Sequence, residues 1–276
     1  MGDRYRKLCF SCCLLLLAGC TDGIVNFFAF YPMRFNADDY SLSDTSVQEL
    51  EVVTEDQVRL HAFYLPVPSS SKLVIFLHGN AGHNLHRLSQ AQRLARSGVN
   101  VLLLSYRGYG RSEGSPSEYG VYRDGRAALQ HAVDHLGFAP ENIFLLGRSL
   151  GSAVAIDMAQ HQSLGGLILI SAFISAHDLM QTAGLGWLGW LVDRRPFDQL
   201  SKLPHISTPA LFIHGTQDRQ VPYRLGEALY AQYPSEYKQM LSVQKAGHND
   251  LFLRDGEIIW QRIAAFIDNP VCVGCR

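Results

Sequence analysis

Short runs of mostly apolar residues recur along the chain and are separated by longer segments of mixed character. Six of these runs lie at residues 73–77, 99–104, 143–146, 167–170, 210–213 and 240–243. Apolar runs of this length are typical of strands that are buried on both faces of a sheet. The chain is therefore predicted to contain a sheet that is covered on both sides.

Apolar residues at helical spacing occupy most of the intervals between these runs. The predicted helices span residues 85–97, 117–136, 151–161, 223–233 and 255–267. Because strands that alternate with helices form a mostly parallel central sheet flanked by helices on both faces, the predicted fold class is α/β. Residues 47–53 and 58–65 precede this region and predict an N-terminal antiparallel hairpin, since the second of them alternates apolar and polar positions.

A segment from about residue 173 to residue 208 interrupts the alternation of strands and helices. Large apolar side chains, Trp187 and Trp190 among them, are interleaved there with glycines. An apolar segment of this kind needs a partner, and we expect a short cap over a site that binds acyl groups. The alternative is a short helix that packs on the core for stability.

Composition and charge exclude several classes of protein. The 276 residues are 47% hydrophobic, which excludes disorder and suffices for one sizeable core or at most two small domains. Lys and Arg number 24 against 25 Asp and Glu, a net charge of −1. Without a basic surplus the chain is not expected to bind nucleic acid.

The first twenty residues have the features of a targeting segment. A basic start precedes an apolar stretch at residues 8–18 that is too short to span a bilayer. The segment ends in Leu-Ala-Gly-Cys at residues 17–20, which resembles the lipobox of bacterial lipoproteins. The resemblance implies that Cys20 is lipidated and becomes the mature N-terminus. The protein would then lie in the bacterial cell envelope, lipid-anchored to a membrane with its main domain outside the cytoplasm.

Two alternatives for this segment are an ordinary cleaved signal peptide and an uncleaved anchor from Leu8 to Tyr31. The anchor would place Asp22 inside the membrane, which is costly.

Two further cysteines, Cys272 and Cys275, lie at the end of the chain. Zinc needs four ligands, so this pair is interpreted as part of a solvated tail that can close a small disulfide.

The sequence Gly-Arg-Ser-Leu-Gly at residues 147–151 follows the third apolar run directly and precedes a helix start rich in small residues. This spacing is typical of a sharp strand-to-helix turn, in which flanking glycines make room for a serine in a strained conformation. The turn lifts the serine hydroxyl above the sheet. Ser149 is therefore the predicted nucleophile.

A serine hydroxyl needs a base, and the base needs an acid that fixes its tautomer. His248 follows the last apolar run and is the predicted base, while His214 is the second choice because it suits a packed position. Asp218 follows the run at 210–213 and is the predicted acid. Histidines on loop or helix positions are expected to be solvated, namely His83, His86, His131, His135 and His161.

Two backbone N–H groups are needed to stabilise the oxyanion that forms during attack. One is expected from Leu150, directly after the nucleophile. The other is expected from Asn80, with Ala81 as second choice, in the glycine-containing loop after the first parallel strand. His78 is interpreted as a structural residue that bonds this loop.

These motifs resemble those of the α/β-hydrolase superfamily over about residues 47–267. His78-Gly79-Asn80, the loop at residues 106–114, the elbow and Gly247-His248 are similar to the ABHD-type branch, which includes protein depalmitoylases. The resemblance implies a serine hydrolase with a Ser–His–Asp triad, no cofactor and no metal. Residues 21–276 would form a single α/β-hydrolase domain after a signal peptide at 1–20. The front end differs from the depalmitoylases, in which a cytoplasmic palmitoylated tail takes this place.

The expected activity is cleavage of carboxylic ester or thioester bonds through an acyl-enzyme intermediate. The expected partners are a small-molecule or lipid-like acyl substrate and a membrane reached through the lipid anchor. A serine peptidase of aminopeptidase type is the alternative, because the same triad cleaves amides. A non-catalytic, membrane-anchored scaffold is a further alternative, and the complete triad argues against it.

Overall fold

The computed structural model describes residues 26, 29–36, 38, 40, 42, 46–182, 184 and 195–271. The predicted signal segment with Cys20 lies outside these residues, and so do Trp187, Trp190 and the terminal cysteines Cys272 and Cys275. Within the described part of the chain, no helix combines the length and the apolar character needed to cross a membrane.

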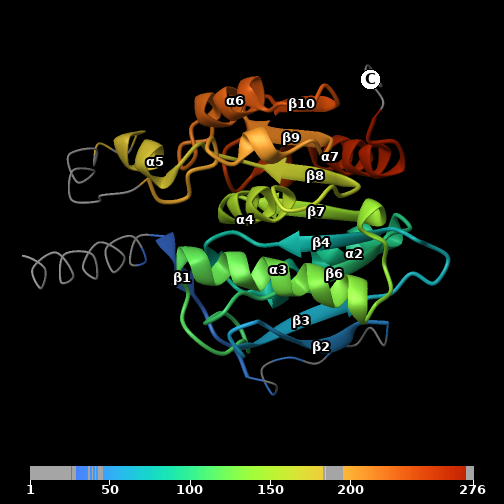
Figure 1. Cartoon of the computed structure of the whole chain (residues 1–276). Coiled ribbons are helices and arrows are strands. Elements are labelled where there is room, and N and C mark those ends of the chain that lie inside the picture. The colour runs from blue at the N-terminus through green and yellow to red at the C-terminus, as the bar shows by residue number, and fades with distance from the viewer. Residues whose placement is uncertain are drawn as a thin grey trace, which may run out of the picture.

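An eight-stranded sheet forms the centre of the molecule, with the strand order β10-β9-β8-β7-β4-β6-β3-β2 (Figure 1). The strands β4 and β6 to β10 are parallel to one another, whereas β3 pairs antiparallel with both β2 and β6. The predicted mostly parallel sheet and N-terminal hairpin are confirmed. The strands are β2 (Gln48–Val53), β3 (Arg59–Leu65), β4 (Leu73–Leu77), β6 (Asn100–Leu104), β7 (Ile143–Arg148), β8 (Gly166–Ile170), β9 (Ala210–Gly215) and β10 (Lys238–Val243).

Helices cover both faces of this sheet. α3 (Glu118–Asp134), α4 (Leu150–Ala159) and α6 (Tyr223–Gln232) contribute to the buried apolar cluster on one face. α2 (Leu88–Arg96) and α7 (Leu251–Asp268) contribute to the cluster on the other face. Each parallel strand contributes side chains to both clusters. Because both faces are buried, these strands are apolar runs in the sequence. α7 begins before the predicted start at residue 255, because a non-helical Asp255 joins two helical pieces.

A second, two-stranded sheet was not predicted from the sequence. β1 (Tyr31–Pro32) pairs in parallel with β5 (Ala81–Gly82). Phe30, directly before β1, is 5% exposed, and its ring centroid lies 6.1 Å from that of Phe197. Phe30 therefore packs on the domain, and Tyr31 is bound to it through its backbone N–H, which donates to the carbonyl oxygen of Asn80.

The described ends of the irregular segment pack on the main core. α5 (Ala176–Thr182) lies at its start, and the short 3-10 helix η5 (Leu203–His205) lies near its end. Phe197, Leu203 and Ile206 are buried in the cluster that also contains α3 and α4. These parts of the segment therefore stabilise the fold. Trp187 and Trp190, the large apolar residues expected in the cap, lie outside the described residues.

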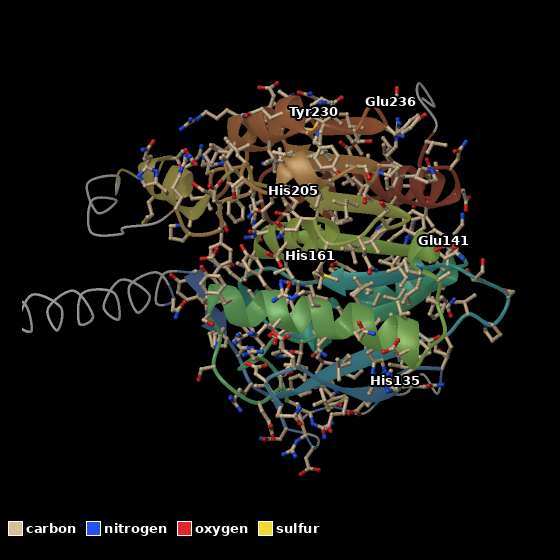
Figure 2. All side chains as sticks on the ribbon, in the orientation of Figure 1. His135, Glu141, His161, His205, Tyr230 and Glu236 are labelled. Carbon is tan, nitrogen blue, oxygen red and sulfur yellow. The ribbon has the colours of Figure 1, made fainter. Side chains whose placement is uncertain are left out.

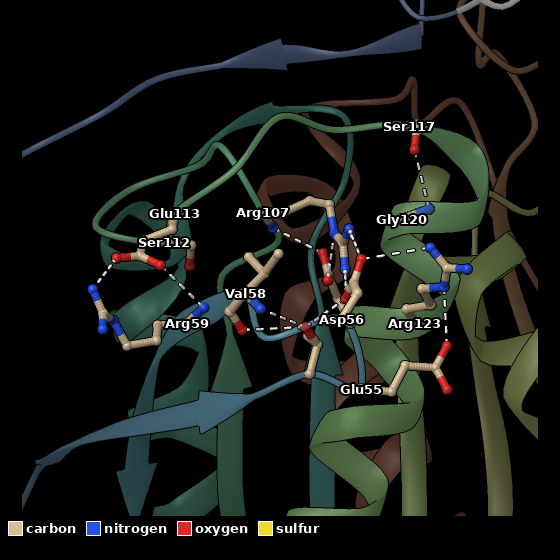
Figure 3. A network of polar contacts seen from close by, with 12 residues as sticks. Glu55, Asp56, Val58, Arg59, Arg107, Ser112, Glu113, Ser117, Gly120 and Arg123 are labelled. Atoms are coloured by element: carbon tan, nitrogen blue, oxygen red, sulfur yellow. Dashed lines mark hydrogen bonds and ion pairs between the residues drawn. The ribbon is translucent and has the colours of Figure 1, made fainter.

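The loop at residues 106–114 is held by a buried ion pair. The Nε atom of Arg107 donates to Asp124 at 2.7 Å, and its Nη1 atom donates to Asp56 at 2.8 Å (Figure 3). The hydrogen bonds from Arg107 hold the pKa of Asp56 far below its usual range. Because the Asp124 side chain is fully buried, loss of Arg107 would leave an unpaired charge in the core. Together these contacts give the loop a structural role, as a turn held against α3 and the hairpin.

Gly151 allows α4 to approach the end of β4. A Cβ atom at residue 151 would lie 2.1 Å from the carbonyl oxygen of Leu77, so Gly151→Ala must displace backbone. We expect this variant to lower the free energy of unfolding by about 1–3 kcal/mol, as overpacking does. Urea denaturation followed by circular dichroism measures the change.

Gly256→Ala is the matched control, because nothing lies within 4 Å of a Cβ atom at this helical position. Alanine there should leave stability unchanged or raise it by up to about 1 kcal/mol. Equal stability of the two alanine variants would contradict the packing argument at Gly151.

Candidate active site

The strand-to-helix turn after β7 has the strained geometry that its sequence predicts. Ser149 has φ 51° and ψ −115°, a positive φ that non-glycine residues rarely adopt. Its N–H donates to the carbonyl oxygen of Ile170 at 2.8 Å, which ties the turn to the end of β8. Its carbonyl oxygen accepts from the hydroxyl of Ser152 at 2.6 Å. These two hydrogen bonds, at the N–H and at the carbonyl oxygen of Ser149, stabilise its strained conformation.

Asp218 and His248 meet at the same edge of the sheet. Asp218 follows β9 and His248 follows β10, and the Nδ1 atom of His248 lies 2.7 Å from Oδ2 of Asp218. The Asp218 side chain is fully buried, and Oδ1 accepts N–H bonds from Gln220 and Val221 at 2.9 and 2.8 Å. Burial favours a raised pKa for Asp218, but the bonds from His248 and Val221 hold the pKa below its ordinary value.

Arg148 links the turn to the histidine loop. Its Nη2 atom donates to the main-chain oxygen of His248 at 2.8 Å and to the side chain of Asn249 at 3.1 Å. Burial, together with the nearby charge of Arg87, lowers the pKa of Arg148 to about 10, so it stays charged at neutral pH. This contact brings the serine and histidine loops together. Among the hydrogen bonds between described residues, none joins the side chains of Ser149 and His248 directly.

The loop after β4 lies beside the serine. A Cβ atom built on Gly79 would lie 3.7 Å from the Cβ of Ser149, in van der Waals contact, so the backbone of this loop runs next to the serine. The Nδ1 atom of His78 lies 2.7 Å from the carbonyl oxygen of Gly79 and must donate to it, because a carbonyl only accepts. Burial lowers the pKa of His78 to about 3, so the ring is neutral. These contacts agree with the predicted structural role of His78.

The carbonyl oxygen of Asn80 is held from outside the loop. It accepts the N–H of Tyr31 at 2.9 Å and the hydroxyl of Tyr109 at 2.7 Å. Leu150 is the first residue of α4, where a helix leaves N–H groups without an intrahelical acceptor. The two backbone positions predicted to bind an oxyanion, Asn80 and Leu150, thus belong to loops that flank Ser149.

The other histidines differ in their exposure. His135, His161 and His205 are exposed on the surface (Figure 2). His214 is buried, and its Nε2 donates to the carbonyl oxygen of Val221 at 2.9 Å, as expected of a packed residue. His83, expected to be solvated, is instead 6% exposed, because its ring lies against Phe35, with 4.6 Å between centroids.

A strained serine, a buried Asp–His pair and a glycine loop at the carboxyl edge of a parallel sheet define a hydrolase of the α/β-hydrolase fold. The structure is similar to that of the esterase Pf2001 of Pyrococcus furiosus, with a TM-score of 0.70 and 22% identity over 88% of this chain and 99% of that chain. The Hydrolase_4 family, described as serine aminopeptidase, S33, matches residues 68–201.

Full-length relatives extend this likeness to the sequence. An uncharacterized protein of Mycobacterium tuberculosis is 34% identical over 233 residues, which cover 82% of this chain and 81% of the relative. The alpha/beta hydrolase domain-containing protein WAV2 of Arabidopsis thaliana is 30% identical over 242 residues, 80% of this chain and 78% of the relative. The chain belongs to the α/β-hydrolase superfamily.

The buried His78 makes stability depend on pH. Its folded pKa of about 3 lies below the unfolded value of 6.5, so the unfolded chain binds the proton more tightly. Its contribution to stability is complete above pH 6.5 and is lost as the pH falls towards 3. From pH 7.5 to pH 5.0 the loss amounts to about 2 kcal/mol.

His78→Asn keeps an N–H near the position of Nδ1 and removes the titration. Urea denaturation should show that this variant loses about 2 kcal/mol less than the wild type between pH 7.5 and 5.0. The exposed His161→Asn serves as the control and should follow the wild type. An unchanged pH dependence in His78→Asn would show that His78 is not held neutral in the fold.

Proposed function

We propose that the protein is a serine hydrolase that cleaves carboxylic ester or thioester bonds. Ser149 is the nucleophile, His248 the general base and Asp218 the acid that orients the base. The observation that carries the proposal is the 2.7 Å contact between Asp218 and Nδ1 of His248 at the edge where the strained Ser149 lies. A carboxylate on Nδ1 leaves Nε2 as the proton acceptor, as a base for serine requires.

The proposed reaction has two stages. Ser149 Oγ attacks the acyl carbonyl while His248 takes its proton, and the N–H groups of Asn80 and Leu150 donate to the oxyanion. His248 then protonates the leaving alcohol or thiol, and Ser149 holds the acyl group. Water, deprotonated by His248, attacks the acyl-enzyme and releases the acid. Throughout, Asp218 stays ionised and stabilises the imidazolium, in line with its lowered pKa.

The esterase named among the similar structures supports an ester substrate, whereas the description of the matching family favours a peptidase. We favour the ester or thioester because the segment at residues 173–208 is rich in large apolar side chains, which suit an acyl group. A serine peptidase of aminopeptidase type is the second candidate.

We also propose that Cys20 carries the lipid that anchors the protein at the cell envelope.

The triad variants test the catalytic assignment. Ser149→Ala, His248→Ala and Asp218→Asn should each lower kcat for a short p-nitrophenyl ester by about 10³-fold or more, and the losses should not add, because the three residues act as a unit. A fluorophosphonate probe should label the wild type and not Ser149→Ala. The exposed His161→Ala is the control for a histidine change away from the site. Near-wild-type kcat in His248→Ala would refute the base assignment and direct the test to His214.

The choice of substrate class is tested by a direct comparison. Higher kcat/KM for p-nitrophenyl esters than for aminoacyl p-nitroanilides supports the esterase. The opposite order would favour the serine peptidase over the esterase. Absence of labelling by the fluorophosphonate probe would favour the non-catalytic scaffold.

The anchor is tested at its predicted lipidation site. Cys20→Ser should leave an unprocessed precursor, because serine lacks the thiol that takes the lipid. Cys12→Ser, in the same segment, should be processed as the wild type is. Mass spectrometry of the mature N-terminus distinguishes these outcomes, and an unmodified N-terminus downstream of Cys20 in the wild type would contradict lipidation.

A further inference from the structure

The segment at residues 29–36, here called the strap, runs past the loop that follows β4. β1, which is labelled in Figure 1, lies within the strap. It pairs with β5, which is part of that loop. The N–H of Tyr31 donates to the carbonyl oxygen of Asn80 at 2.9 Å, and the N–H of Met33 donates to that of Gly82 at 3.3 Å. The strap therefore contacts the loop on both sides of Ala81.

The strap acts through its backbone and is held by its own aromatic residues. The side chains of Tyr31 and Met33 are about half exposed, at 50% and 52%, so they are not what binds the loop. Phe30 and Phe35, at 5% and 7% exposed, are buried in the two apolar clusters on opposite faces of the sheet. Burial of one aromatic ring at each end keeps the strand between them in place.

The loop at residues 106–114 also holds the strap and the carbonyl group of Asn80. The N–H of Gly110 donates to the carbonyl oxygen of Met33 at 2.8 Å, and the hydroxyl of Tyr109 donates to that of Asn80 at 2.7 Å. The Asn80 oxygen thus accepts from the strap and from the loop at residues 106–114. Both lone pairs of this oxygen are used, which fixes the direction of the carbonyl group.

Peptide planarity carries this constraint to the candidate oxyanion donors. A carbonyl and the following N–H lie in one rigid plane, so fixing the Asn80 carbonyl fixes the N–H of Ala81. In the same way, the bond from His78 to the Gly79 carbonyl fixes the N–H of Asn80. Because the peptide planes on both sides of Asn80 are held, neither the Asn80 N–H nor the Ala81 N–H can rotate without breaking these bonds.

We infer that the strap is a positioning element for the oxyanion loop, and that the Tyr31 N–H is the group through which it acts on the Asn80 peptide. This inference rests on the proposed function, because it assigns the strap to the same site. The strap does not touch the reacting atoms. It fixes the orientation of the Ala81 N–H, the second candidate for the oxyanion donor, and holds the peptide that follows Asn80, the first candidate. Complete removal of one oxyanion donor costs about 10²–10³-fold in kcat in a serine hydrolase.

The test removes one hydrogen bond from the full-length chain. Tyr31→Pro has no N–H to offer Asn80, whereas Tyr31→Ala keeps the N–H and shortens the exposed side chain. The kcat of the proline variant for a short p-nitrophenyl ester should be about 10-fold or more below that of the alanine variant, with KM within about 2-fold. Tyr109→Phe removes the second donor to the same oxygen and should lower kcat in the same way.

Two further measurements separate positioning from folding. Active-site titration with a fluorophosphonate corrects kcat for the fraction of folded enzyme, and Tm reports stability. The Ki of a trifluoromethyl ketone, which forms a tetrahedral adduct with the serine, should rise by the same factor as kcat/KM falls, because both depend on the oxyanion donors.

The outcomes are distinct. Equal kcat and Ki in Tyr31→Pro and Tyr31→Ala would overturn the inference, as would a loss that titration and Tm explain in full. A wild type with neither probe labelling nor turnover of esters or anilides would instead refute the proposed function and the inference with it.

Discussion

The close approach of the β7–α4 turn to the end of β4 is the constraint on which the site depends. Cβ atoms at Gly147 and Gly151 would lie 2.3 and 2.1 Å from backbone oxygens, so this packing is open to glycine alone. The turn forces Ser149 into a positive φ and places it beside Gly79. The N-terminus of α4 and the loop after β4 therefore flank the serine as a result of packing in the core.

Around this turn the protein keeps its buried polar groups either paired or neutral. Asp218 is ionised because three hydrogen bonds reach its two oxygens, from His248 and the N–H groups of Gln220 and Val221. His78 stays uncharged because burial disfavours its protonated form. The charge of Arg107 is also paired, because its buried guanidinium forms an ion pair with Asp124. A buried charge without its partner would destabilise the fold by more than the intact pair stabilises it. Each loop therefore has one strongly preferred conformation, in which its charged groups are paired.

The sequence alone is sufficient for the central sheet and for the edge of it at which the candidate site residues lie. Strands β4 and β6 to β9 are apolar runs because both faces are covered, and residues that follow parallel strands must meet at one edge. The contacts between strand ends are less predictable. Nothing in the sequence spacing indicates that Arg148 bonds the loop of His248, because that contact depends on how far a buried side chain reaches across the edge.

The strap and His83 escaped prediction for a related reason. Two-residue pairing such as β1 with β5 leaves no periodic pattern, and the apolar residues around Phe30 match a membrane anchor as well as a core. His83 follows a glycine loop, where a solvated histidine is the ordinary expectation, and it is buried because Phe35 of the strap and the stacked ring of His86 lie against it. In both cases a segment distant in the sequence is part of the cause.

Chain connectivity joins the strap to the proposed anchor. Ala29 lies nine residue steps after Cys20, and an extended chain spans at most about 3.6 Å per step, so the strap lies within about 32 Å of a lipidated Cys20. The same strap donates to Asn80 and Gly82 in the loop beside Ser149. Given the anchor and the strap as proposed, the carboxyl edge of the sheet is held near the membrane surface. On the proposed function, the edge with the proposed nucleophile Ser149 would then lie close to the membrane from which lipid-like acyl substrates come.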